Sequence, residues 1–142
     1  MGKKDVHKLS VDKGHSFVLY GISSHENDYR LSWAFNEYLG FRFTKTENHK
    51  SFDPRLNEYQ EFSTYSFYDD EYSHSYKLIS NRCDNGFLLD ELKNIDFLLI
   101  LEQNTTSSLP AIEIISKIKT IPFVSAVFPI NLTSLKNLKK IL

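Results

Sequence analysis

The chain has 142 residues, of which 41% are hydrophobic, 14% aromatic and 25% charged, a composition typical of globular domains rather than disordered chains. Its formal net charge is −1, from 17 basic and 18 acidic residues, which excludes a global electrostatic attraction to nucleic acid or anionic membranes. This length suits one hydrophobic core, so we expect a single domain over residues 1–142.

The cysteine count and the N-terminus indicate where the chain resides. Cys83 is the single cysteine, so no intrachain disulfide can form and a reducing compartment fits best. The first residues are polar and lack the apolar run of a signal peptide. No apolar run approaches the roughly 20 residues that span a bilayer. We therefore expect a cytoplasmic protein without membrane contact.

The first half of the chain alternates strand and helix patterns. A capping box of Ser23 and Glu26, with Ser24 as the competing cap, is expected to start a helix with a stripe of apolar residues, and Gly40 is a natural C-terminal stop. The expected elements are an edge strand or flexible lead-in at 1–13, a strand at 16–22, this helix, a strand at 41–44 and a loop at 47–57.

The second half begins with an aromatic-rich hairpin around an acidic turn. Residues 95–101 are almost continuously apolar, which predicts a central strand covered on both faces. The expected elements are strands at 60–68 and 72–80, a turn at 81–86, a helical turn at 87–94, a strand at 95–101, a helix at 108–119 capped by Ser108, a strand at 123–128, and a C-terminal helix from Asn131 or Thr133.

This order predicts an α+β fold. Two β-α-β units separated by a hairpin favour a two-layer α/β sandwich, in which both helices cover one face of the sheet. The expected architecture is therefore ferredoxin-like or ACT-like, with βαβ–hairpin–βαβ order and a C-terminal helix. The comparison with ligand-binding ACT domains concerns architecture alone.

The segment Leu89–Phe97, with sequence LDELKNIDF, resembles the signature of the IPExxxVDY family of small bacterial proteins. Glu91 and Asp96 match this signature outright, whereas Asp90 stands where the family has a rigid proline. Further stretches carry the same likeness, at residues 7–9, 21–25, 28–31, 78–82, 85–86, 121–123 and 134–136. The resemblance implies a bacterial cytoplasmic protein, and it implies no reaction, ligand or catalytic residue.

The signature carboxylates are expected to serve the fold. Asp96, at the start of a strand, can bond backbone N–H groups nearby, and Glu91 can hold a neighbouring backbone group or pair with Lys or Arg. The functional alternative is a site of paired carboxylates formed by Glu91 and Asp96.

The densest polar functionality lies where the first strand passes into the first helix. Unpaired N–H groups at a helix start can bind an anion, and a histidine can add proton transfer. The residues expected to bind a ligand or partner are Ser23, Ser24, His25, Asp28, Tyr29 and Arg30. The alternative is helix capping plus a surface pair of Glu26 and Arg30, because no glycine-rich phosphate loop accompanies the serines.

Other polar groups predict no chemistry. The acidic turn at 69–71 reads as solvated, because three consecutive acids rarely supply the ligand geometry of a cation site. The five histidines show no paired spacing, and Cys83 alone completes no zinc set and has no predicted base. The aromatic hairpin lacks the basic-aromatic run of RNA-binding sheets. We therefore expect no catalytic residue, no metal and no cofactor.

These observations favour a small non-catalytic binding or adaptor domain. Its partner is expected to be a protein or a small ligand, nucleic acid is disfavoured, and a homodimer stays open. The alternatives are an RNA-associated protein, because RNA-binding modules also use βαβ sandwiches, and an enzyme with an unrecognised site near His25.

Overall fold

The structure is a computed structural model that describes residues 15–71, 73–104, 111–136 and 138–141. The elements in chain order are β1 (His15–Ser24), α1 (Asp28–Leu39), β2 (Thr44–Lys45), β3 (His49–Asp53), β4 (Glu58–Phe62), β5 (Thr64–Asp69), β6 (His74–Ser80), β7 (Arg82–Cys83), β8 (Gly86–Phe87), the 3₁₀ turn η1 (Asp90–Leu92), β9 (Phe97–Asn104), α2 (Ala111–Ile118), β10 (Val124–Ile130), and the 3₁₀ turns η2 (Leu132–Ser134) and η3 (Leu138–Lys140).

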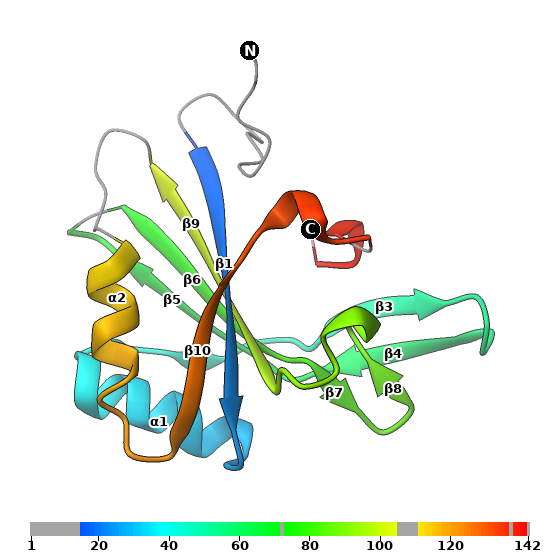
Figure 1. Cartoon of the computed structure of the whole chain (residues 1–142), viewed down its shortest axis with the longest axis horizontal. Coiled ribbons are helices and arrows are strands. Elements are labelled where there is room, and N and C mark those ends of the chain that lie inside the picture. The colour runs from blue at the N-terminus through cyan, green and yellow to red at the C-terminus, as the bar shows by residue number, and fades with distance from the viewer. Residues whose placement is uncertain (1–14, 72, 105–110, 137, 142) are drawn as a thin grey trace.

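A six-stranded antiparallel sheet dominates the described part of the chain, with strand order β10-β1-β9-β6-β5-β2 (Figure 1). The expected central strand is confirmed: β9 pairs with β1 on one side and with β6 on the other. Two smaller hairpins, β3-β4 and β7-β8, lie outside this sheet. We call the β3-β4 hairpin the arm, because it extends away from the sheet in Figure 1.

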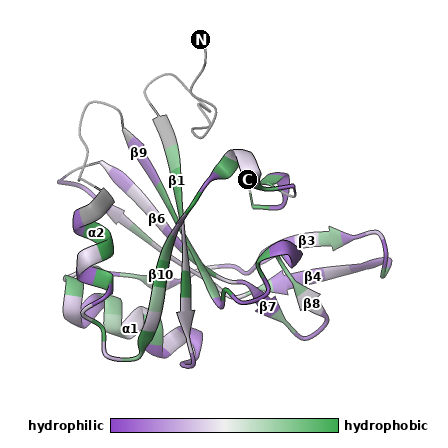
Figure 2. Ribbon diagram, viewed as in Figure 1, coloured by the Kyte–Doolittle hydropathy of each residue, from purple (hydrophilic) through white to green (hydrophobic). Residues whose placement is uncertain are grey.

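Both helices cover one face of the sheet. Each alternates hydrophilic and hydrophobic residues along its length, as Figure 2 shows, and turns its apolar side to the strands. Leu31 and Phe35 of α1 and Ile118 of α2 are fully buried there against Tyr20 and Leu99 of the sheet. Aromatic side chains, among them Phe41, Phe43, Phe67 and Tyr76, close this core at the β5 end with ring centroids 4.7–6.4 Å apart.

The opposite face carries a second apolar cluster that no α-helix covers. Because strand side chains alternate between faces, Leu19, Leu98 and Ile100 point away from the helices. The segment before β9 and the C-terminal turns cover part of this face, through Leu89, Ile95, Leu132 and Ile141 among others. None of the described elements covers the rest of this face.

The expected ferredoxin-like or ACT-like two-layer sandwich is wrong. Among the described residues strands are more abundant than helices, and the six-stranded antiparallel sheet is accompanied by two α-helices. The difference lies in the pairing: β1 and β2, which flank α1, stand far apart in the strand order, and β9 and β10, which flank α2, both pair antiparallel with β1. The sheet therefore contains no βαβ unit of neighbouring strands, and the arm is added outside it.

Several local expectations also fail. The expected loop at 47–57 contains β3, and the expected strand at 60–68 is divided between the arm and the sheet at Ser63. The expected C-terminal helix is replaced by two 3₁₀ turns, although Asn131 does cap the first of them by accepting a hydrogen bond from the Thr133 N–H. Residues 1–13 and Ser108 lie outside the described residues.

The first helix forms where expected, with a different cap. Asn27 is the N-cap and its side chain accepts from the Arg30 N–H at 3.0 Å, whereas Ser23 and Ser24 belong to β1. Gly40 ends the helix in the left-handed conformation with φ 74°, as the sequence predicts. No helix in the described ranges is long and apolar enough to cross a membrane.

Candidate functional site

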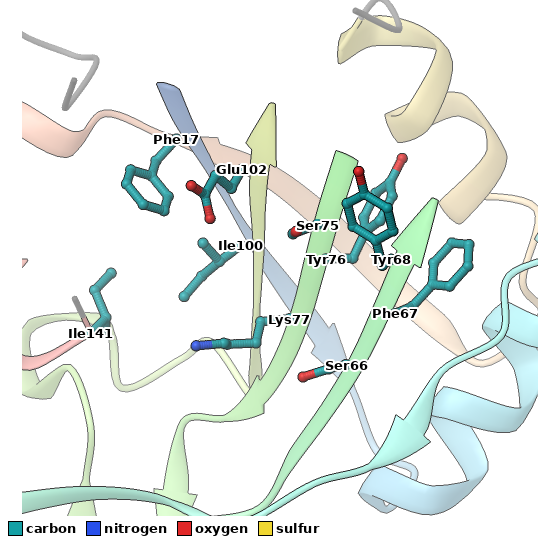
Figure 3. A pocket seen from close by; sticks show the side chains of 10 residues that line it. All are labelled: Phe17, Ser66, Phe67, Tyr68, Ser75, Tyr76, Lys77, Ile100, Glu102 and Ile141. Carbon is teal, nitrogen blue, oxygen red and sulfur yellow. The ribbon is translucent and has the colours of Figure 1, made fainter. Parts of the chain in front are cut away.

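The open part of the helix-free face forms a groove of about 650 Å³. Phe17, Ile100, Lys77 and Glu102 lie on one side of the strands, with Ile141 of the C-terminal segment facing them, whereas Phe67 points to the other side (Figure 3). The full lining consists of Phe17, Ser66, Phe67, Tyr68, Ser75, Tyr76, Lys77, Ile100, Glu102 and Ile141. A groove of this volume is within the usual range of small-ligand sites.

The strand register explains why these side chains meet. Phe17 pairs with Glu102, Glu102 with Ser75, and Ser75 with Tyr68, so one row crosses four strands. Two residues further along, Ile100 pairs with Lys77 and Lys77 with Ser66. Residues two apart on a strand share a face, so both rows form the groove floor.

A polar hollow of about 470 Å³ continues the groove at its Lys77 end. It shares Ser66 and Lys77 with the groove, and its other lining residues are Thr46, Glu47, Asn48, His49, Lys50 and Thr64. Within the described ranges the Lys77 ammonium makes no hydrogen bond or ion pair. The groove is thus mainly apolar apart from Glu102 and Ser75, the hollow is polar, and an uncommitted cation lies where the two parts meet.

Asp96 of the signature segment ties three parts of the chain together. Its Oδ2 accepts a hydrogen bond from the Ser24 N–H at 2.9 Å, beside a bulge in β1. Its Oδ1 accepts from Arg82 Nε at 3.0 Å, and the Arg82 guanidinium also lies 2.8 Å away as an ion pair. Both carboxylate oxygens are therefore engaged in holding the edge of the fold.

Glu91 makes a similar contact elsewhere. Its Oε2 accepts from the backbone N–H of Lys136 at 2.7 Å and so fixes the segment between η2 and η3. Asp96 and Glu91 thus serve different neighbours, and neither carboxylate lines the groove. Asn81, fully buried, supports the same region by donating to the carbonyls of Leu92 and Ile95 and accepting from the Leu89 N–H.

The structure places the two serines of the strand-to-helix segment in structural roles. Ser23 Oγ donates to the Asn94 carbonyl at 3.1 Å, and Ser24 Oγ donates to the Phe123 carbonyl at 2.8 Å. Ser24 also accepts from the Glu26 N–H. Because Asn27 caps the helix and Asp28 adds a negative charge to its first turn, this end of α1 is poorly suited to an anion.

The remaining candidates of this segment diverge from one another. His25 is exposed, and Tyr29 is 64% exposed. The Arg30 guanidinium lies over the rings of Trp33 and Phe123, at 5.7 and 5.5 Å from their centroids. The six residues expected to form a site therefore do not converge on one cavity.

The Asp28 side chain, at the first residue of α1, contacts the segment that joins β4 to β5. Its carboxylate accepts a hydrogen bond from the Ser63 hydroxyl. Burial, followed by the nearby Asp28 charge, raises the pKa of Tyr65 above 10.0. This tyrosine is therefore neutral at physiological pH and acts as a donor or acceptor of hydrogen bonds.

The other polar features of the sequence remain separate from the groove. The acidic turn, Asp69 to Glu71, lines a hollow of about 480 Å³ on the helix side that also contains Arg42 and Lys117. Among the described residues, no group of three or more His, Cys, Asp or Glu side chains is placed to hold a metal ion. Cys83 is a free, half-buried thiol that donates to Asn85 Oδ1 at 3.0 Å.

Sequence reasoning missed the groove residues. Ser66, Ser75, Lys77 and Glu102 alternate with Phe67, Tyr76 and Leu101 along three strands, and this alternation was a readable signal for a face with polar positions. What the pattern could not reveal is which part of this face the described C-terminal turns cover. Comparison with known proteins adds no candidate, because no family model, curated protein or solved structure matches the chain.

Proposed function

We propose that this protein is a small non-catalytic binding domain whose binding surface is the groove on the helix-free face of the sheet. The observation that carries the proposal is the groove itself: about 650 Å³ of space against an apolar floor formed by Phe17, Ile100 and Ile141. Ligand sites are typically concave and mostly apolar, with a few polar groups that orient the ligand. Ser66, Ser75, Lys77 and Glu102 are the polar groups here.

Two predictions from the sequence remain part of this proposal. A cytoplasmic location is supported by Cys83, which is the single cysteine and a free thiol. Membership of the IPExxxVDY family is supported by the match of Glu91 and Asp96 to the signature.

The test is binding of N-phenyl-1-naphthylamine, a neutral apolar dye that fluoresces when it leaves water. The wild-type protein is expected to bind the dye. Tyr68→Ala removes one aromatic side chain from the groove lining and is expected to weaken binding. Tyr68 is 56% exposed, so its truncation leaves the core intact.

Tyr59→Ala is the matched control, because Tyr59 is 68% exposed and lies on the arm, outside the groove. Equal loss of dye binding in both variants, or no binding by the folded wild-type protein, would contradict the proposal. A protein or RNA captured through the groove would instead compete with the dye and identify an adaptor or RNA-associated role.

A further inference from the structure

We infer that the ligand of this groove is a free amphipathic anion, with an apolar chain along Phe17 and Ile100 and a carboxylate or similar head group at Lys77. This inference rests on the proposed function and names its ligand class. It is argued from the mainly apolar groove and the polar hollow, which meet at Ser66 and Lys77.

The apolar end can accept a hydrocarbon chain. Ile100 and Ile141 are only 8% and 6% exposed, so they offer an apolar surface with little contact to water. The Phe17 ring lies on the same side of the strands (Figure 3). Covering the remaining apolar surface removes it from water and so favours binding of the chain. This contribution is indifferent to the charge of the head group.

The Lys77 end of the groove selects the charge of the ligand's head group. Lys77 lies at the junction of the groove and the polar hollow, next to the Ser66 hydroxyl across the strand pair. Lys50 adds a second positive charge to the hollow, and Glu47 adds one negative charge. An anionic head can accept from the ammonium and the hydroxyl without breaking an existing contact of Lys77.

Lys77 sets the orientation of the ligand, and Glu102 lies at the other end of the groove. Glu102 occupies the other row of the groove floor, beside Phe17 and Ser75, on the side away from the polar hollow. An anion is attracted to the Lys77 ammonium, where the groove meets the hollow. The ligand is therefore expected to bind with its head toward the hollow and its chain toward Phe17.

The experiment compares three eight-carbon ligands with the same chain and different heads: octanoate, 1-octanol and octylammonium. Each is titrated below its aggregation concentration into the ¹⁵N-labelled full chain, and the dissociation constant is taken from amide chemical-shift changes. Octanoate is expected to bind about fivefold more tightly than octanol, the scale of one exposed ion pair. Octylammonium is expected to bind more weakly than either.

Lys77→Gln should reduce the affinity for octanoate to that for octanol and leave octanol binding unchanged. Lys119→Gln, a substitution of an exposed lysine outside the groove, should change neither affinity. If the three ligands bind equally, or octylammonium binds best, the anionic ligand class is wrong while a binding groove remains. If none of them shifts groove amides and the neutral dye also fails, the proposed function itself is wrong.

Discussion

Individual polar side chains hold this fold at points where strands end. Asp96 is the clearest case, because its carboxylate satisfies the Ser24 N–H at a bulge and pairs with Arg82 at the same time. Its contacts are those of a structural residue, and the bond to Ser24 spans 72 positions of sequence. Such long-range contacts contribute to stability by joining segments that would otherwise separate.

Asp96→Asn should lower the free energy of unfolding by about 1–3 kcal/mol, because the amide replaces one acceptor and removes the charge that faces Arg82. Equilibrium denaturation in urea measures the loss. Asp84→Asn, in the exposed turn between β7 and β8, is the control and should change stability by less than about 0.5 kcal/mol. A variant of Asp96 with full stability but altered ligand binding would point to a functional carboxylate instead.

Tyr20 represents the opposite case, a buried polar atom that the fold leaves unsatisfied. The residue is fully buried, its hydroxyl has no hydrogen-bond partner in the described part of the chain, and burial raises its pKa above 10.0. Removing an unsatisfied hydroxyl relieves a desolvation penalty.

Tyr20→Phe should therefore leave the protein equally stable or more stable by up to about 1 kcal/mol. Tyr65→Phe is the matched control: its hydroxyl interacts with Ser32 and Asp28, so the same deletion should destabilise by about 1 kcal/mol. Thermal or chemical denaturation of both variants checks the contrast. Equal destabilisation by the two substitutions would show that Tyr20 has a partner.

Among the elements, the arm shows how a hairpin outside the main sheet is held in place. An isolated two-stranded hairpin is marginally stable in water, so the arm needs anchors. Phe62 is fully buried at its base, and the buried Gln60 donates to the Asn85 carbonyl. At the far end, Arg55 bridges Asp53 and Asp90 at 3.3 and 2.8 Å.

The Asp53 contact predicts a pH dependence for arm stability. The Arg55 hydrogen bonds lower the pKa of Asp53 below 3.8 in the folded protein. An acid with a lowered folded pKa contributes stability that is present above its unfolded pKa and is lost as the pH falls through the folded value.

Asp53→Asn should therefore be less stable than wild type at pH 7, and the difference should shrink as the pH falls below 3.8. Urea denaturation at pH 7, 4 and 2.5 measures the trend. Asp70→Asn, at the exposed turn after β5, should show no such convergence. A constant difference between wild type and Asp53→Asn at all three pH values would exclude the ion pair as its source.

For the whole molecule, the two apolar clusters share one sheet. Neighbouring residues of the same strand serve opposite faces: Leu19 and Leu98 belong to the cluster beneath the C-terminal segment, and Tyr20 and Leu99 to the cluster beneath the helices. Loss of either cluster therefore exposes the strands that support the other.

Unfolding should consequently be a single cooperative transition. Fluorescence of Trp33, the single tryptophan, reports on α1, and far-ultraviolet circular dichroism reports mainly on the remaining secondary structure. The two thermal transitions are expected to coincide within error. Separate midpoints would show that the helix layer and the sheet unfold independently, and would contradict the single-domain prediction.

The amino-acid sequence by itself determined the elements whose patterns are local. The continuous apolar run after Asp96 predicts the central strand, and the left-handed Gly40 ends the helix whose apolar stripe precedes it. These features depend on residues within one or two turns of each other, which is why they can be read directly. The same local logic failed for the first helix cap, because Ser23 and Ser24 bond to carbonyls 71 and 99 positions away.

Only the tertiary structure decided the sheet order, the arm and the groove. Whether residues 47–57 make a loop or contribute a strand to a second hairpin depends on partners elsewhere in the chain, which alternation alone does not specify. The groove exists because the C-terminal segment, held by Glu91, covers one part of a sheet face and leaves Lys77 and its neighbours open. Coverage of a surface is a property of the packed chain, and no short stretch of sequence carries it.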